Sequence, residues 1–167
     1  STSKSAISRR FIKQTKTALA ELMARDLSAH DIAVLMVDGE QLAAIDQGYV
    51  ILLGIGKDDT PATAETMVKK IANLRVFSDD AGKMNLSILD IKGSAIVVSQ
   101  FTLYADTRKG NRPSFVNSGP PDMAEPLVET FIDLLQQQGV PTQSGQFGAD
   151  MKVEILNDGP VTILLEY

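Results

Sequence analysis

Runs of apolar residues divide much of the chain into strands. The six apolar residues at 32–37 predict a buried strand, and Asp38-Gly39 directly after them is a strong signal for a two-residue hairpin. The chain returns over 40–45, turns, and enters another apolar run at 49–55. The pattern therefore predicts three consecutive strands, of which the first two are antiparallel.

Two later stretches have the three- and four-residue apolar spacing of an amphipathic helix. The first begins with Thr60 as its N-cap and Pro61 at its first position. The second covers about 122–138, where Asp122 and Glu125 have the spacing of a capping box. The expected apolar faces are Ala64, Met67, Val68, Ile71 and Leu74 in the first helix, and Met123, Leu127, Val128, Phe131, Ile132 and Leu135 in the second.

The remaining pattern indicates more strands around a long loop. Residues 94–102 predict a mostly buried strand, and 105–121 form a loop rich in Gly, Pro and Asn. Two more strands are expected at 151–156 and 161–166. Several strands with two helices indicate an α+β fold with antiparallel or mixed sheets, here expected to form a barrel-like core.

The chain is expected to be one domain over residues 1–167. Residues 1–8 are small and polar and are expected to be disordered, while Arg10–Gln14 resembles a strand. Residues 16–27 have helical apolar spacing and predict an additional N-terminal helix.

Composition excludes several kinds of chemistry. The absence of cysteine excludes disulfides, thiolate metal sites and cysteine nucleophiles. The single histidine, His30, is either a base or ligand, or a surface residue at an element boundary, and we favour the surface position. Zinc sites usually combine several nitrogen or sulfur ligands. We therefore expect no metal and no other cofactor.

Charge and hydropathy limit the possible partners. No apolar run approaches the ~18 residues of a membrane span, and the N-terminus lacks a secretory pattern, so we expect a cytoplasmic protein without a membrane partner. A net charge of −5 argues against broad coating of nucleic acid. Between 106 and 115, however, Arg108, Lys109 and Arg112 oppose Asp106 alone. This segment is either a local RNA contact or a solvated loop.

Two motifs carry the functional signal. Ser99-Gln100-Phe101-Thr102-Leu103 ends an apolar strand, and Asn157-Asp158-Gly159-Pro160-Val161-Thr162 places a Gly-Pro step between two strands. Together they resemble the D-aminoacyl-tRNA deacylase family, which includes D-tyrosyl-tRNA deacylase and removes D-amino acids wrongly attached to tRNA. The resemblance runs from Met36 to Tyr167. It also includes Asp38-Gly39-Glu40, Leu52-Leu53-Gly54, Lys83-Met84-Asn85, Thr107-Arg108-Lys109-Gly110, Arg112-Pro113-Ser114-Phe115 and Phe147-Gly148-Ala149-Asp150-Met151.

The resemblance implies hydrolysis of the aminoacyl ester, which needs a nucleophile, normally water, and stabilisation of an oxyanion. We expect Ser99, Gln100, Phe101 and Thr102 to be catalytic, with backbone N–H groups of the last three near the reacting carbonyl. The Thr102 hydroxyl either attacks or positions substrate or water. A threonine nucleophile needs a base, so we favour positioning. The family is also compatible with assistance from the ribose 2′-hydroxyl of the substrate, and Asp150 receives no role.

In the family, a cis Gly-Pro step projects into the site of a neighbouring subunit, where its carbonyl oxygens fill the space of an L side chain. The matching pair is Gly159-Pro160, so the resemblance implies a homodimer that excludes L-amino acids. Glycine has no side chain to clash, and glycyl-tRNA mischarged on a non-cognate tRNA is therefore an expected second substrate.

The expected contacts with the acceptor end of tRNA follow from charge and aromatic character. Arg108, Lys109 and Arg112 are candidates for phosphates. Phe115 or Phe147 either stacks on the terminal adenine or belongs to the core. Met151 and Asn157 complete the expected substrate- and tRNA-binding set.

The N-terminal third departs from the family pattern, because Thr15 stands where family members commonly have an arginine. Two alternative functions therefore remain. One is a relative with a trans Gly-Pro step that acts on mischarged L-aminoacyl-tRNA. The other is a non-enzymatic dimer that binds nucleotides or nucleic acid.

Overall fold

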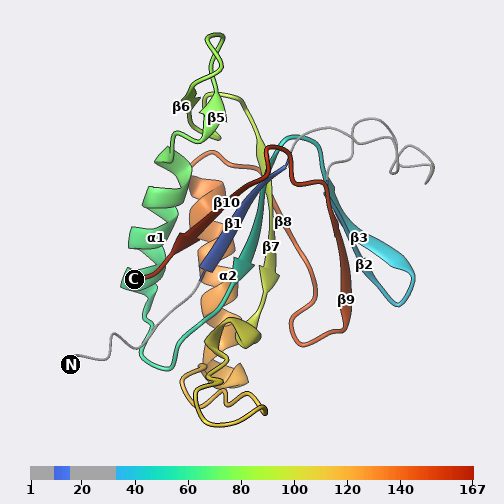
Figure 1. Ribbon diagram of the computed structural model, residues 1–167, viewed down its shortest axis with the longest axis vertical. Coiled ribbons are helices and arrows are strands. Elements are labelled where there is room, and N and C mark those ends of the chain that lie inside the picture. The colour runs from blue at the N-terminus through green and yellow to red at the C-terminus, as the bar shows by residue number, and fades with distance from the viewer. Residues whose placement is uncertain (1–9, 16–32) are drawn as a thin grey trace.

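The computed structural model describes residues 10–15 and 33–167 (Figure 1). Within these ranges the chain forms helices α1 (Pro61–Asn73) and α2 (Pro121–Gln137) and a short 3₁₀ turn at Phe101–Tyr104. The strands are β1 (Arg10–Thr15), β2 (Ala33–Val37), β3 (Glu40–Ile45), β4 (Gly48–Leu53), β5 (Phe77–Ser78), β6 (Met84–Leu86), β7 (Ser94–Ser99), β8 (Thr142–Ser144), β9 (Met151–Ile155) and β10 (Val161–Leu165).

The strands form three sheets, which confirms the expected α+β class with mixed strand directions. The largest has the order β10-β1-β4-β7-β8, in which β7 runs parallel to both β4 and β8 while β1 is antiparallel to its neighbours. A second sheet has the order β3-β2-β9, and β5 pairs with β6 in a small hairpin. Figure 1 shows both helices on one side of the five-stranded sheet and the β3-β2-β9 sheet on the other.

The central strands of the five-stranded sheet, β4 and β7, are buried on both faces. Along β4, Tyr49, Ile51 and Leu53 pack into the helix-side core, whereas Val50 belongs to a second core shared with β2 and β3. Successive side chains of a strand point to opposite faces. Burial on both sides therefore explains why this part of the sequence is continuously apolar rather than alternating.

The barrel-like core expected from the sequence is not found in the described strands. The two larger sheets stay open and pack face to face, with Leu35, Ala43 and Ile96 among the residues between them. Their edges are joined instead by a side chain. The Gln143 amide accepts a hydrogen bond from the Ala44 N–H (3.0 Å) and donates one to the Ala44 carbonyl (2.8 Å).

Several local expectations are confirmed. Asp38 and Gly39 have φ of 49° and 79°, the left-handed pair that a type I′ hairpin requires, and glycine adopts this conformation without a steric cost. Thr60 caps α1 and Pro61 begins it. The expected strand near Arg10 is β1.

Other expectations were wrong or lie outside the described residues. Helix α2 begins one residue earlier, after Pro120, which makes no side-chain cap, so the Asp122 capping box does not form. The strand predicted over 94–102 ends at Ser99, and the chain then enters the 3₁₀ turn. The pattern also missed β8. The additional helix at 16–27, the N-terminal segment 1–8 and His30 lie outside the described residues.

Strand register places the two signature motifs at opposite ends of the fold. Ser99 ends β7 beside Leu53, whereas Val161 pairs with Gln14, which in turn pairs with Tyr49 near the start of β4. The four residue steps from Tyr49 to Leu53 along β4 span about 13 Å at ~3.3 Å per residue. Figure 1 agrees, with the turn between β9 and β10 at one end and the 3₁₀ turn after β7 at the other.

The bridge between the sheets gives a stability prediction. Replacing Gln143 with Ala removes both hydrogen bonds to Ala44 and should lower the free energy of unfolding by about 1 kcal/mol. Urea denaturation at one fixed protein concentration measures it. Gln137→Ala, an exposed change on α2, is the matched control and should stay within about 0.5 kcal/mol of the parent. Equal stability of the two variants would contradict a bridging role.

Candidate functional site

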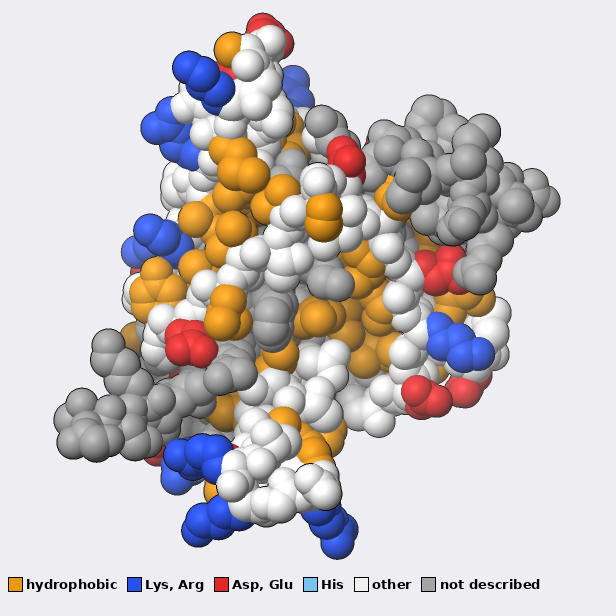
Figure 2. All heavy atoms as spheres, viewed as in Figure 1, with side chains coloured by type: hydrophobic (Ala, Val, Ile, Leu, Met, Phe, Trp, Pro, Cys, Tyr) orange, Lys and Arg blue, Asp and Glu red, His pale blue; other side chains and the backbone are white. Residues whose placement is uncertain are grey.

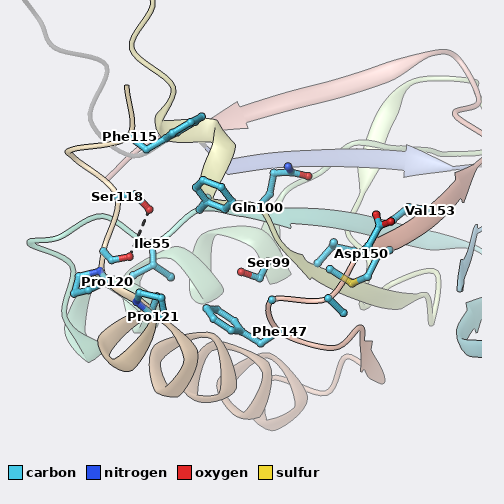
Figure 3. Close-up of a pocket in the computed structure, with 17 residues that line it drawn as sticks. Ile55, Ser99, Gln100, Phe115, Ser118, Pro120, Pro121, Phe147, Asp150 and Val153 are labelled. Carbon is cyan, nitrogen blue, oxygen red and sulfur yellow. Dashed lines mark hydrogen bonds between the residues drawn. The ribbon is translucent and has the colours of Figure 1, made fainter. Parts of the chain in front are cut away.

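A cavity of about 650 Å³ opens at the carboxyl end of β7 (Figure 3). In Figure 3 the Ser99 hydroxyl and the Phe147 ring lie near its middle, Phe115 lies on the loop side, and Asp150 and Val153 lie on the β9 side. Its lining is mainly apolar with small polar groups. The lining residues are Ile55, Val98, Ser99, Gln100, Phe101, Phe115, Ser118, Gly119, Pro120, Pro121, Ala124, Phe147, Gly148, Ala149, Asp150, Met151 and Val153.

The chain leaves the five-stranded sheet after Ser99, where Ser99, Gln100 and Phe101 line the cavity. The Gln100 N–H still donates to the Leu53 carbonyl (2.8 Å), so this N–H is already used by the sheet. The Gln100 carbonyl then accepts the Leu103 N–H (3.2 Å), which closes the first bond of the 3₁₀ turn. The first N–H groups of such a turn have no turn carbonyl before them. Three backbone N–H groups were expected near the reacting carbonyl. Those of Phe101 and Thr102 remain available to a ligand, because only the Gln100 N–H is bonded to the sheet.

The Thr102 side chain is held by its neighbour. The Gln100 side-chain amide donates a hydrogen bond to the Thr102 hydroxyl oxygen. The hydroxyl proton of Thr102 then points elsewhere, because the oxygen acts as acceptor in this bond. Thr102 itself is not among the residues that line the cavity.

A long-range contact brings the loop before α2 to the cavity. The Gly119 N–H donates to the Ile55 carbonyl (2.8 Å), and Gly56 and Ser118 form an isolated antiparallel bridge. At Gly56 a side chain would meet the ring of Tyr104, because an added Cβ would lie 2.4 Å from the Tyr104 hydroxyl oxygen. Glycine at position 56 therefore lets the 3₁₀ turn pack against the end of β4.

Aromatic rings form the mouth and the floor of the cavity. Phe101 and Phe115 stack edge to face with ring centroids 5.0 Å apart, and Phe101 is 57% exposed. Phe147 lines the cavity and also packs against the helix-side core. The expected place of Phe147 in the core is therefore confirmed, and its contact with the terminal adenine stays a prediction. Met151 lines the same side.

The basic segment forms a closed loop beside the mouth. Asp106 and Ser114 exchange two backbone hydrogen bonds of 2.8 and 2.9 Å, which close the loop immediately before Phe115. The Arg108 guanidinium donates to the Asp106 carboxylate through Nε (2.9 Å) and Nη2. These hydrogen bonds hold the pKa of Asp106 well below its usual range and raise that of Arg108.

The cations of this loop lie outside the cavity. Arg108, Lys109 and Arg112 are exposed and do not line it. Figure 2 shows Lys and Arg side chains at the end of the molecule where Figure 1 places this loop. The sequence set three cations against Asp106 alone, and the structure shows that Arg108 is the cation that pairs with it.

The Gly159-Pro160 turn is exposed, and its peptide bond is cis, the isomer that the family resemblance implies. Asn157 organises this turn. Its side-chain oxygen accepts the Val161 N–H (3.1 Å), and its nitrogen donates to the Thr162 hydroxyl (3.1 Å). Neither Asn157 nor the Gly-Pro step lines the cavity of its own chain.

The lining limits the chemistry of the site. Among the described lining residues, only Asp150 has a titratable side chain. The described part of the chain also contains no group of three or more His, Asp or Glu side chains arranged to hold a metal ion. None of its helices is long and apolar enough to cross a membrane. The polar side chains of the lining are Ser99, Gln100, Ser118 and Asp150.

Sequence reasoning missed the far wall of the cavity. Ile55, Ala124, Val153 and the segment 118–121 belong to the lining but carried no chemical signal. Gly119 and the two prolines after it were seen only as loop residues. The backbone bridge between Gly56 and Ser118 connects residues 62 positions apart, and no local pattern predicts such a contact.

Comparisons with known proteins agree with this geometry. A family model described as D-Tyr-tRNA(Tyr) deacylase matches residues 28–166. A protein named D-aminoacyl-tRNA deacylase from Roseiflexus castenholzii is 57% identical over 134 residues, which cover 80% of this chain and 85% of that protein. A protein of the same name from Thermomicrobium roseum is 55% identical, covering 80% of this chain and 87% of that protein.

Two solved structures share the fold. The c-Myc DNA Unwinding Element Binding Protein superposes with a TM-score of 0.80 at 37% identity, over 95% of this chain and 98% of that one. A structure titled as a probable eukaryotic D-amino acid tRNA deacylase has a TM-score of 0.73 at 16% identity, over 95% and 99%.

The close packing at Gly56 predicts the effect of a small substitution. Gly56→Ala places a methyl group against Tyr104 and should lower the free energy of unfolding by about 1–3 kcal/mol. Adding Tyr104→Phe removes the nearest atom and should recover part of that loss. Urea denaturation of the single and double variants measures both effects. A Gly56→Ala protein as stable as the parent would show that this contact is not tight.

Proposed function

We propose, because this chain belongs to the D-aminoacyl-tRNA deacylase family, that it hydrolyses the ester bond of D-aminoacyl-tRNA and releases tRNA and a free D-amino acid. The observation that carries the proposal is the cavity at the end of β7. The family motif Ser99-Gln100-Phe101 forms one wall of it, and Phe147 and Met151 of a second family motif form another.

Catalysis in this proposal rests on the backbone where the 3₁₀ turn begins. The N–H groups of Phe101 and Thr102 stabilise the oxyanion, while the Gln100 N–H stays in its bond to Leu53. Water is the nucleophile, and the ribose 2′-hydroxyl of the substrate assists its attack. The Thr102 hydroxyl positions substrate or water, since its oxygen already accepts a bond from Gln100 and the lining offers it no histidine as a base.

The acceptor end of tRNA fits the surroundings of the cavity. The apolar lining suits the amino-acid side chain and the terminal adenine, with Phe115 or Phe147 as the stacking surface. The exposed cations Arg108, Lys109 and Arg112 lie on the loop that leads into Phe115, and they contact backbone phosphates. RNA contact then stays local, in keeping with a net charge of −5.

Chiral selection requires a second copy of the chain. Gly159-Pro160 is exposed and lies at the end of the sheet opposite Ser99, so it cannot reach the cavity of its own chain. In a two-fold dimer each copy inserts this turn into the cavity of the other. The backbone carbonyls of the turn then occupy the space that an L side chain needs, and glycyl esters escape this exclusion.

A second candidate function has one specific observation in its favour. The solved structure at 37% identity carries the name of a DNA-binding protein. A chain that binds nucleic acid without turnover would use the same exposed cations. Stereospecific hydrolysis distinguishes the two, since binding alone produces none.

The direct test compares three substrates. Purified protein should hydrolyse D-tyrosyl-tRNA and glycyl-tRNA rapidly and spare L-tyrosyl-tRNA, because only the L side chain clashes with the selector. Activity should persist in a metal chelator. Release of labelled amino acid measures all three rates.

Other outcomes would favour a different function or a different mechanism of selection. Equal hydrolysis of D and L esters would favour the relative with a trans Gly-Pro step. Inert glycyl-tRNA would contradict selection by steric exclusion alone. No hydrolysis of any ester, with tRNA still bound, would favour the nucleic-acid-binding candidate.

A further inference from the structure

The Asp106 carboxylate makes three contacts with one neighbouring residue. Its Oδ1 accepts the Arg108 backbone N–H (3.0 Å) and the Arg108 Nε–H (2.9 Å), and its Oδ2 accepts a bond from Arg108 Nη2. This two-pronged contact matches the planar geometry of both groups and fixes the orientation of the guanidinium. In this arrangement Asp106 orients the Arg108 side chain on the loop.

Exposure differs strongly between the two partners. The Asp106 side chain is 26% exposed, whereas that of Arg108 is 67% exposed. A guanidinium has five N–H bonds. The one on Nε and one of the two on Nη2 donate to Asp106. The remaining N–H bonds, two on Nη1 and one on Nη2, face away from the carboxylate. They form an oriented donor set that suits a second anion.

The backbone of this loop leads directly to the cavity mouth. Asp106 pairs with Ser114 through two backbone hydrogen bonds, and the next residue, Phe115, lines the cavity and stacks on Phe101. An ester bound in the cavity belongs to the last nucleotide of the RNA. If the ester binds there, as proposed above, we expect the phosphate that joins this nucleotide to the preceding one to lie near the mouth, within reach of this loop.

We propose that Asp106 is a positioning residue that orients Arg108 so that the free N–H groups of its guanidinium bind a phosphate of the tRNA acceptor end. The inference rests on the proposed function and adds a residue to it. Asp106 does not touch the RNA, and it acts only through Arg108.

Electrostatic repulsion alone predicts the opposite effect of Asp106 on RNA binding. An acidic residue beside an RNA-binding loop repels phosphates, so neutralising it should tighten binding if it has no other role. If Asp106 instead orients Arg108, neutralising it releases the guanidinium and weakens binding. Tighter RNA binding after neutralisation of Asp106 therefore indicates repulsion, and weaker RNA binding indicates that Asp106 orients Arg108.

The experiment uses Asp106→Asn in the full chain, because asparagine retains an oxygen for the Arg108 backbone N–H but loses the two-pronged carboxylate. The KM for D-tyrosyl-tRNA should rise on the order of tenfold with kcat unchanged, the scale of one charge-assisted hydrogen bond. The variant should also flatten the salt dependence of tRNA binding, by about 0.7 in log Kd per log salt for one lost phosphate contact on a single strand.

Two comparisons make the test specific. D-tyrosyl adenosine carries the same ester without any phosphate, so the loss on tRNA should exceed the loss on this compound by about the same tenfold. Arg108→Ala should reproduce the loss, and the double variant should be no worse than Arg108→Ala alone. Asp80→Asn makes the same charge change on the exposed β5–β6 turn and is the matched control.

Tighter or unchanged tRNA binding by Asp106→Asn would overturn the inference. Equal losses on tRNA and on D-tyrosyl adenosine would also overturn it, since they indicate a structural role of the loop. Failure of the parent protein to hydrolyse D-tyrosyl-tRNA would instead count against the proposed function. The binding measurement on uncharged tRNA still decides the role of Asp106 in that case.

Discussion

Burial of β4 and β7 on both faces is the constraint on which the rest of the molecule depends. The two strands lie side by side and parallel, with helices against one face and the β3-β2-β9 sheet against the other. No polar side chain can be placed along them without the cost of burial. Polar groups therefore gather where the strands end, and the carboxyl ends of parallel strands are a common place for ligand sites. The cavity lies at these strand ends, since its lining includes Ser99, the last residue of β7, and Ile55, two residues after β4.

The same register separates the two family motifs. The site motif follows the carboxyl end of β7, and β9 starts beside the cavity at Met151 and runs away from it. The Gly159-Pro160 turn must then form at the far end of the sheet. A mechanism that uses both motifs on one substrate consequently needs two copies of the chain. The distance between the two motifs follows from the fold itself. The second copy of the chain belongs to the proposed mechanism.

Much of the fold could be predicted because its signals are local. Asp38-Gly39 specifies its own hairpin, and Thr60 with Pro61 specifies the start of α1. The errors arose where distant residues decide the structure. The chain turns after Ser99 although Phe101 and Leu103 remain apolar, and the short strand β8 has a polar sequence that only its pairing with β7 organises.

The candidate site was predictable to the extent that family motifs form it. Ser99, Gln100, Phe101, Phe115, Phe147 and Met151 do line one cavity. The opposite wall depends on the hydrogen bond from the Gly119 N–H to the Ile55 carbonyl. No sequence pattern in either segment predicts this long-range contact. The count of charges in 106–115 included Asp106, but it could not show that the Asp106 carboxylate pairs with Arg108 rather than with Lys109 or Arg112.

The most direct test of this account measures whether the Gly-Pro turn of one copy meets the cavity of another. The chain contains no cysteine, so single thiols can be introduced without background. Asp158→Cys marks the turn and Asp150→Cys marks the cavity wall. The account predicts that a short bismaleimide links the two variants into a covalent dimer when they are co-expressed, at a yield well above that of either variant expressed alone. Absence of that dimer under conditions of stereospecific hydrolysis would contradict a site completed by a second copy.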